Sequence, residues 1–161
     1  MHRGPRIRAD IICCFIARRG ILGLEFLQMR RTDGHLSGSW QPIMGSCEEG
    51  EDATTTMWRE VREETGLEKS AKHLLGAWSL EGVRPFFMAR ANAVVLSPTF
   101  LLEVSREWHP VLNEEHDAHR WTQEDKVAEM FLWPGHAMQA REAAMILRGH
   151  ACEAFVRVPV A

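Results

Sequence analysis

The sequence lacks any apolar run near its start that is long enough to cross a membrane. The apolar stretch at residues 11–17 ends at Arg18 and Arg19, and no small-residue cleavage site follows it. A membrane-spanning helix needs about 20 apolar residues. We therefore expect neither a signal peptide nor a membrane span, and no membrane partner.

The sequence is also poor in cysteine. Its four cysteines form no C-x-x-C pair and show none of the dense spacing of a disulfide-rich secreted scaffold: Cys13, Cys14, Cys47 and Cys152. Adjacent residues of an extended segment point to opposite faces, so Cys13 and Cys14 should lie on different sides of a strand. We expect small, buried thiols in a reducing compartment and hence a cytoplasmic protein.

No internal repeat, low-complexity tract or linker interrupts the chain. Its 161 residues are 45% apolar and 25% charged, close to the globular average, which argues against disorder, collagen-like repeats and a coiled coil. A chain of this length suits one domain of ordinary size. The sequence therefore predicts a single domain over residues 1–161.

The chain has no excess of positive charge. Its net charge is −3, from 19 basic and 22 acidic residues, so it offers no uniformly basic face for long nucleic acid. The near-neutral total conceals two opposed regions: residues 1–31 hold seven arginines, whereas residues 45–68 hold eight carboxylates. Only three basic residues are lysines, and arginine forks suit phosphate or carboxylate. Solvation of sheet edges is the alternative explanation for these arginines.

Extended and helical segments alternate along the chain. Branched and aromatic residues predict strands at 7–17, 21–29, 74–80, 86–96 and 100–104, and Gly20 and Gly23 make the first two a hairpin before a loop at 33–39. Four-residue spacing predicts a helix at 52–65 stopped by Gly66. A second helix should run from Pro134 to Arg148, and a weaker capping-box signal, Thr122 with Asp125, predicts a short helix before it. This order predicts an α/β fold.

An acidic stripe lies on the helix expected at 52–65. Glu60, Glu63 and Glu64 occupy positions i, i+3 and i+4, so their carboxylates share one face beside the apolar face of the helix. Like charges at this spacing repel, and a hard cation such as Mg²⁺ would compensate them. Arg59 can reach Glu63 and Glu51, which suits it to orienting carboxylates. Taken alone, three glutamates in this pattern are more commonly a solvated acidic face than a metal site.

The surrounding residues resemble the Nudix box, G-x5-E-x7-R-E-U-x-E-E-x-G-U, where U is aliphatic. Every defined position is present: Gly45, Glu51, Arg59, Glu60, Val61, Glu63, Glu64, Gly66 and Leu67. The resemblance implies an α/β/α sandwich with a mixed, curved sheet between helices. It also implies hydrolysis of a nucleoside diphosphate linked to another group, by water attack at phosphorus with Mg²⁺ or Mn²⁺.

The same resemblance implies the residues of the site. Glu60, Glu63 and Glu64 would be metal ligands, with the Gly45 carbonyl as a further one. The segment from Glu115 to Trp121 is similar to the E-H-x4-W segment of many Nudix enzymes, so Glu115 is a candidate fourth ligand or general base. Arg59, Glu63, Glu64 and Glu115 are thus the candidate catalytic residues. Whether the base lies in the box or on the later loop stays open.

Residues just before the box are similar to those of the dihydroneopterin triphosphate and dATP pyrophosphohydrolase group, whose triphosphate substrates would give a monophosphate and pyrophosphate. Trp40 and Gln41 could stack on and hydrogen-bond a base or pterin ring, although a tryptophan entering a strand often covers the core. Arg30, Arg31 and Arg84 are candidates for the phosphates or leaving group. Surface salt bridges are the alternative for these three.

Two other functions remain open. One is a catalytically idle Nudix domain that senses a nucleotide, although all the box acids are kept; the other is an RNA-end or cap pyrophosphohydrolase, although an extended basic tract is lacking. His116 and His119 should be packing or solvent residues, since no zinc-ligand pattern surrounds them. The expected partner is a small phosphorylated substrate, bound by a monomer or a homodimer.

Overall fold

A mixed sheet forms the centre of the molecule in a computed structural model that describes residues 4–32, 34–131, 133–150 and 156–160. Its strands follow the order β10-β3-β2-β9-β6. They are β2 (Ile11–Arg19), β3 (Leu24–Arg31), β6 (Leu74–Ser79), β9 (Thr99–Val104) and β10 (His116–Gln123). Strands β2 and β9 are parallel, and the other neighbours are antiparallel. The expected hairpin between the first two long strands is confirmed.

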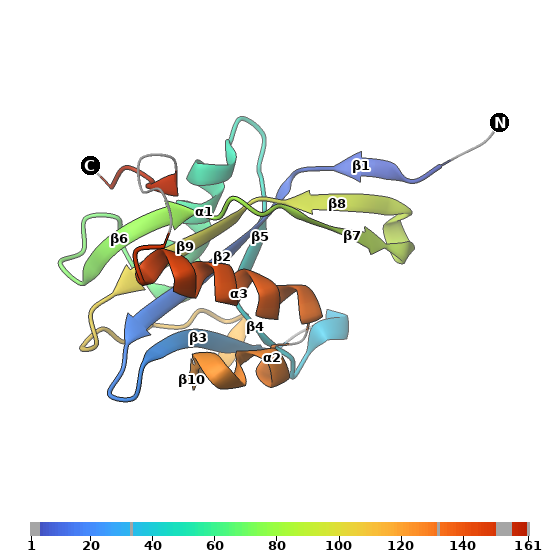
Figure 1. Ribbon diagram of the computed structural model, residues 1–161. Helices are drawn as coiled ribbons and strands as arrows, with labels where there is room; N and C mark the ends of the chain where they lie inside the picture. The colour runs from blue at the N-terminus through green and yellow to red at the C-terminus, as the bar shows by residue number, and fades with distance from the viewer. Residues whose placement is uncertain (1–3, 33, 132, 151–155, 161) are drawn as a thin grey trace.

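Helices cover both faces of this sheet, as expected for an α/β/α sandwich (Figure 1). Along β2, Ile12, Cys14 and Ile16 pack with helix α1 (Ala53–Thr65), whereas Cys13, Phe15 and Ala17 pack with helix α3 (Pro134–Leu147). Because neighbouring strand residues alternate, one apolar strand supplies both cores. The two thiols therefore lie on opposite faces, as predicted, and burial raises the pKa of each. Cys152 lies outside the described residues.

The helix predicted at 52–65 is confirmed, and its ends are set locally. The Asp52 carboxylate accepts a hydrogen bond from the Thr55 backbone N–H at 2.7 Å, which satisfies a free donor at the helix start. Gly66 closes the helix with φ of 69°, in the left-handed region that suits glycine. Helix α1 therefore begins within one residue of the predicted start and ends where the four-residue spacing and Gly66 place its end.

A second, three-stranded sheet extends to one side of the molecule (Figure 1). Its strands are β1 (Arg6–Arg8), β8 (Ala93–Ser97) and β7 (Arg84–Met88) in spatial order. The single strand predicted at 86–96 is wrong, because the 3₁₀ turn η2 (Ala89–Ala91) and Asn92, with φ of 45°, reverse the chain. The run predicted at 7–17 is likewise divided between β1 and β2.

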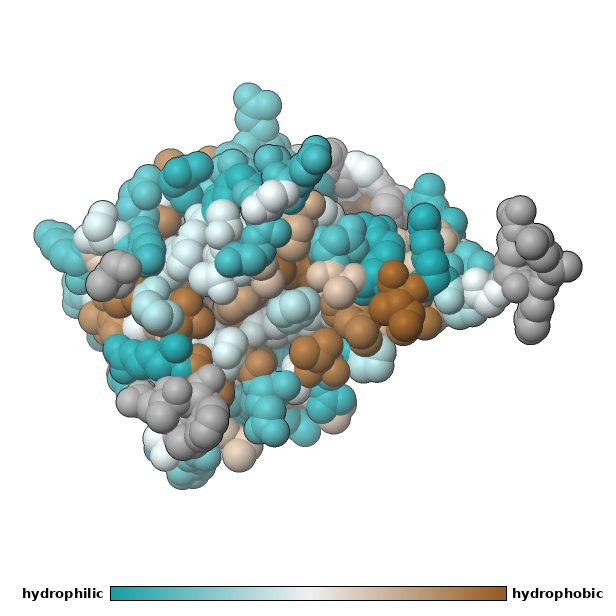
Figure 2. Space-filling view, turned by 90° about the horizontal axis from the view of Figure 1, so that it is seen from above, coloured by the Kyte–Doolittle hydropathy of each residue, from teal (hydrophilic) through white to brown (hydrophobic). Residues whose placement is uncertain are grey.

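Exposed apolar side chains lie on this smaller sheet. Ile7, Phe86 and Phe87 are all exposed, Phe87 by 58%. The space-filling view has its strongest apolar colour toward the side from which the small sheet extends (Figure 2). Among the described residues, no helix combines the length and apolar character that a bilayer crossing requires.

Three short elements follow or interrupt the main strands. The 3₁₀ turn η3 (Glu124–Lys126) and α2 (Val127–Met130) precede α3, which confirms a short helix there, and η1 (Gly34–Leu36) lies in the expected loop. The capping box is wrong: Thr122 belongs to β10, and its hydroxyl donates to Gln28 Oε1 at 2.7 Å. Strands β4 (Trp40–Gln41), β5 (Ile43–Ser46) and β10 were not expected from the sequence.

Candidate active site

The segment that leads into the box fills a gap between two central strands. Strands β2 and β3 pair only at residues 17–19 and 24–26. Beyond that point β4 pairs with β3 and β5 pairs with β2, with Gly45 opposite Ile12. A Cβ atom on Gly45 would lie 2.1 Å from Cδ of Glu60. Gly45 therefore allows the loop backbone to approach the first acid of α1.

Arg59 is the hydrogen-bonding centre of the box. Its Nε and Nη2 donate to the two carboxylate oxygens of Glu51 at 2.8 and 3.0 Å, and Nη2 also donates to the Ser46 carbonyl at 3.0 Å. Nη1 donates to Glu60 at 2.8 Å and to Glu63 at 3.3 Å. The guanidinium of Arg59 lowers the pKa of Glu51 to about 2. These contacts have the geometry expected of a residue that orients carboxylates.

Glu64 is the most deeply placed acid of the site. Its exposed fraction is 3%, and its Oε2 has no hydrogen-bond partner. Nε2 of His116 lies 3.9 Å from that oxygen, beyond hydrogen-bonding distance. Burial raises the pKa of Glu64 well above its ordinary value, and the charges of Glu60 and Glu115 raise it further. A buried carboxylate of this kind is unfavourable unless a proton or a cation neutralises it.

The donor set fits a hard divalent cation. Glu64 offers an unpartnered oxygen, and the absence of a side chain at Gly45 leaves its backbone close to the Glu60 carboxyl. Carboxylate and carbonyl oxygens are the ligands that Mg²⁺ prefers. Within the described part of the chain, no three His, Cys, Asp or Glu side chains already form a metal-binding cluster. Arg59 instead holds the carboxylates of Glu60 and Glu63 by hydrogen bonds.

Glu115 comes to the site from the loop before β10. Its carboxylate lies 3.1 Å from Nη2 of Arg31, and its charge raises the pKa values of Glu60 and Glu64. Asn113 Oδ1 accepts a hydrogen bond from the Glu115 backbone N–H at 3.2 Å, which fixes the start of this segment. The structure thus brings Glu115 and Arg31 toward the acids of α1.

His116 faces the site, which sequence reasoning did not anticipate. The prediction for His116 is a packing or solvent residue; it is buried, as a packing residue would be, and its ring also approaches Glu64. The signal that could have found it is its place directly after Glu115 in the E-H segment. Its Nδ1 lies 3.3 Å from Asn113 Oδ1, so the same loop residue contacts both members of the pair.

The candidate substrate-binding residues do not lie together on one face of the central sheet. Arg31 faces the α1 side, whereas Arg30 precedes it on β3 and therefore points to the opposite face, where Asp117 accepts both of its hydrogen bonds at 2.7 and 2.9 Å. Trp40 and Gln41 are neighbours on β4, so their side chains also point to opposite faces of the sheet. Gln41 is buried, and its amide donates to the Ser39 hydroxyl at 2.6 Å. Arg84 begins β7 in the other sheet and is exposed.

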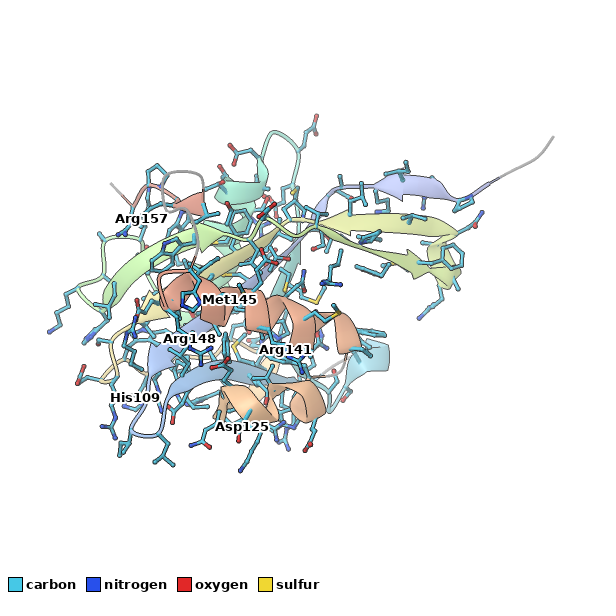
Figure 3. All side chains as sticks on the ribbon, viewed as in Figure 1. His109, Asp125, Arg141, Met145, Arg148 and Arg157 are labelled. Atoms are coloured by element: carbon cyan, nitrogen blue, oxygen red, sulfur yellow. The ribbon has the colours of Figure 1, made fainter. Side chains whose placement is uncertain are left out.

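Two surface cavities lie away from the box. One of about 320 Å³ is lined by Arg141 and Arg148 of α3 and by Asp125 of η3, among others (Figure 3). Arg148 is held there by a double hydrogen bond to Glu124. The other, of about 310 Å³, lies beside Arg18 and Arg106. Neither cavity includes a box residue, so the acids of α1 are not the lining of either one.

Comparisons with known proteins agree with this architecture. The NUDIX domain family model matches residues 6–142. A curated relative from Mus musculus, bis(5'-nucleosyl)-tetraphosphatase [asymmetrical], is 31% identical over 100 residues, which cover 61% of this chain and 63% of the relative. The match therefore spans less than two-thirds of that relative's length.

Solved structures share the fold at lower identity. A C. elegans Ap4A hydrolase in a binary complex superimposes with a TM-score of 0.72 at 18% identity, covering 88% of this chain and 99% of that one. The E. coli dihydroneopterin triphosphate pyrophosphohydrolase gives 0.71 at 21% identity, covering 90% and 99%. At such identities the likeness concerns the fold, whereas the family model covers most of the chain and the complete box. The chain belongs to the NUDIX domain family.

Proposed function

We propose that the protein is a Mg²⁺-dependent pyrophosphohydrolase that cleaves a nucleoside or pterin triphosphate by water attack at phosphorus. The products would be a monophosphate and pyrophosphate, and Mn²⁺ would substitute for Mg²⁺. The observation that carries this proposal is the buried, unpartnered Glu64 carboxylate beside acids that Arg59 holds in place. Family membership and the names of the relatives, which concern nucleotide and pterin polyphosphates, support the same class of substrate.

The residues that would hold the metal are the acids at the end of the box helix and the neighbouring loops. They are Glu60, Glu63, Glu64, Glu115 and the Gly45 carbonyl. The bound metal would neutralise phosphate charge and lower the pKa of a water molecule. Arg59 would orient these acids, because it donates hydrogen bonds to both Glu51 and Glu60. Arg31, beside Glu115, is placed to contact a phosphate near the same acids.

The proton of the attacking water needs an acceptor in this site. Glu115 is about half exposed and is bound on one side by Arg31, so its carboxylate can reach a water molecule. Glu63 is similarly exposed, at the end of the Arg59 network. Comparing the pH–rate profiles of Glu115→Gln and Glu63→Gln would distinguish these two bases, because the variant that lacks the base loses the acid limb of the profile.

A second candidate substrate is a dinucleoside polyphosphate. The observation that favours it is the similarity to the Mus musculus tetraphosphatase. The two substrates can be told apart by their products, because attack on a dinucleoside tetraphosphate yields two nucleotides, whereas the proposed attack on a triphosphate releases pyrophosphate.

The test is a hydrolysis panel with purified protein and Mg²⁺ or Mn²⁺. The panel contains nucleoside triphosphates, dihydroneopterin triphosphate, dinucleoside polyphosphates and nucleotide sugars, and products are identified by chromatography. Pyrophosphate release from a triphosphate supports the proposal. If nothing in the panel is hydrolysed while nucleotides still bind, the idle sensor replaces the proposed hydrolase; preferential attack on 5′-triphosphate RNA would indicate an RNA-end hydrolase.

We also propose that the protein is located in the cytoplasm. The three described cysteines are free thiols, which suits a reducing compartment.

A further inference from the structure

One side-chain oxygen organises the loop that carries Glu115. Oδ1 of Asn113 accepts a hydrogen bond from the Glu115 backbone N–H at 3.2 Å and lies 3.3 Å from Nδ1 of His116. The backbone carbonyl of Asn113 also accepts a hydrogen bond from the His116 backbone N–H at 3.3 Å. Asparagine side chains commonly bond to the backbone two residues further along a turn. Asn113 thus holds the backbone of Glu115 and the ring of His116 through a single atom.

These contacts decide which ring nitrogen of His116 carries a proton. A backbone N–H can only donate, so the atom of Asn113 that meets the Glu115 N–H is its oxygen and not its amide nitrogen. That oxygen can only accept, so Nδ1 of His116 is the donor in the second contact. A neutral imidazole has one N–H, and its other nitrogen is an acceptor. In the neutral ring of His116, Nε2 therefore carries no proton.

This nitrogen without a proton faces Glu64. Nε2 of His116 lies 3.9 Å from Glu64 Oε2, too far for a hydrogen bond, although the two side chains are only 3% and 4% exposed. The Glu64 oxygen has no hydrogen-bond partner. A proton on Nε2 would allow His116 to donate a hydrogen bond to this carboxylate, which would then be satisfied by the ring in place of a cation. The tautomer set by Asn113 excludes that competition.

The rest of the loop is held by a residue outside it. Thr32, directly after β3, donates from its backbone N–H to the Glu115 carbonyl at 2.9 Å and from its hydroxyl to the Glu114 carbonyl at 3.0 Å. Neither hydrogen bond involves the Asn113 side chain. A shorter side chain at position 113 should therefore change the His116 ring more than the path of the loop.

We propose that Asn113 is a positioning residue: it accepts the Nδ1 proton of His116, which keeps Nε2 from donating to Glu64 and leaves the Glu64 oxygen available to the divalent cation. This inference rests on the proposed function, because it concerns the metal that the acids of α1 would hold. Asn113 touches neither the cation nor the substrate in this scheme. Its effect passes through the His116 ring.

The first test measures Mn²⁺ binding by electron paramagnetic resonance of the free ion, at about pH 8, where histidine is ordinarily neutral. Asn113→Ser keeps a hydroxyl for the Glu115 N–H but lacks the length to reach the His116 ring. We expect its Kd for Mn²⁺ to rise about tenfold, as for other residues that orient metal ligands. Adding His116→Phe removes the competing donor, so the double variant should regain wild-type affinity. Asn92→Gly, at the other asparagine of the chain and in a left-handed conformation, should bind like the wild type.

A second measurement needs neither metal nor substrate. Heteronuclear NMR of isotope-labelled histidine side chains distinguishes the two tautomers, and the His116→Phe protein identifies the signals of His116. The wild type should carry the proton on Nδ1, and Asn113→Ser should shift it toward Nε2. An Nε2 proton in the neutral wild-type ring would overturn the proposal. Unchanged Mn²⁺ affinity in Asn113→Ser, or weak binding that persists in the double variant, would overturn it as well.

Failure of the proposed function can be told apart from failure of this role. If the wild type binds Mn²⁺ but hydrolyses nothing in the panel, the proposed hydrolase is excluded, and the binding and NMR results still decide the role of Asn113. Unchanged affinity in an Asn113→Ser protein that remains active overturns only the role of Asn113. A wild type that binds no Mn²⁺ would overturn both.

Discussion

Arg59 and Glu51 form a double hydrogen bond between the helix and the loop that precedes it, with N–O distances of 2.8 and 3.0 Å. Glu51 also accepts hydrogen bonds from the Glu48 backbone N–H at 3.0 Å and from the Thr56 hydroxyl at 2.9 Å. Its carboxylate thus joins the loop, the first turn of α1 and Arg59. The third guanidinium nitrogen of Arg59, Nη1, donates hydrogen bonds to Glu60 and Glu63.

Breaking this pair should impair catalysis more than folding. The Glu51→Gln substitution replaces a charged carboxylate with a neutral amide that has only one acceptor oxygen. Arg59 then loses one of its two hydrogen bonds to residue 51 and the attraction of the negative charge. We expect kcat to fall about 10- to 100-fold, as for other residues that orient metal ligands, with a circular dichroism spectrum like that of the wild type. Steady-state kinetics at saturating Mg²⁺ checks this. Arg62→Lys, at an exposed position of the same helix, is the control, and a Glu51→Gln enzyme within twofold of wild type would contradict the role.

Removing the charge of Glu64 should abolish stabilisation by the metal. Glu64→Gln keeps the shape of the side chain but buries no charge, so without metal its melting temperature should equal or exceed that of the wild type. Mg²⁺ should raise the melting temperature of the wild type and leave that of the variant nearly unchanged. Differential scanning fluorimetry with Mg²⁺ and with EDTA measures both effects. Glu68→Gln, an exposed acid just beyond the helix, should respond like the wild type. An equal Mg²⁺ response in Glu64→Gln would contradict its role as a ligand.

A methyl group at Gly45 should disturb the site directly. In Gly45→Ala the new Cβ would meet Glu60 Cδ at 2.1 Å, so the Glu60 carboxyl must move. We expect turnover to fall more than about tenfold and stability to fall by about 1–3 kcal/mol. The control is Gly135→Ala in α3, where no atom lies within 4 Å of an added Cβ and the helix should gain up to about 1 kcal/mol. Chemical unfolding and kinetics of both variants provide the comparison, and equal behaviour of the two would contradict the prediction.

The box could be predicted from the sequence because its signals are local. The spacing of Glu60, Glu63 and Glu64 sets one helix face, and Gly66 stops the helix within the same short segment. Strand β10 could not be predicted, because its burial follows from pairing with β3 and its residues lack apolar alternation. The division of 86–96 was missed for a related reason: Asn92 adopts a left-handed conformation that apolar neighbours conceal.

Strand pairing also explains why neighbouring candidate substrate residues on β3 point to opposite faces of the sheet. Arg30 and Arg31 look equivalent in the sequence, and only the register of β3 decides which of them faces α1. Cζ of Arg120 lies 3.9 Å from the centroid of the Trp40 ring, although the two residues belong to strands that pair with opposite edges of β3. Such a contact is a property of the sheet order, which no local spacing encodes.

His136 should make folding sensitive to mild acid. Its ring is 6% exposed and packs edge-on against Phe15 and Phe131, at centroid distances of 6.0 and 5.6 Å, and its Nδ1 lacks a hydrogen-bond partner. Burial lowers its pKa to about 4, whereas an unfolded histidine titrates near 6.5. The folded state therefore favours the neutral ring, and the stability this ring contributes is complete above pH 6.5 and is lost as the pH falls toward 4. Between pH 7 and 4.5, urea unfolding should show the wild type losing about 2–3 kcal/mol more than His136→Leu, and equal losses would contradict this assignment.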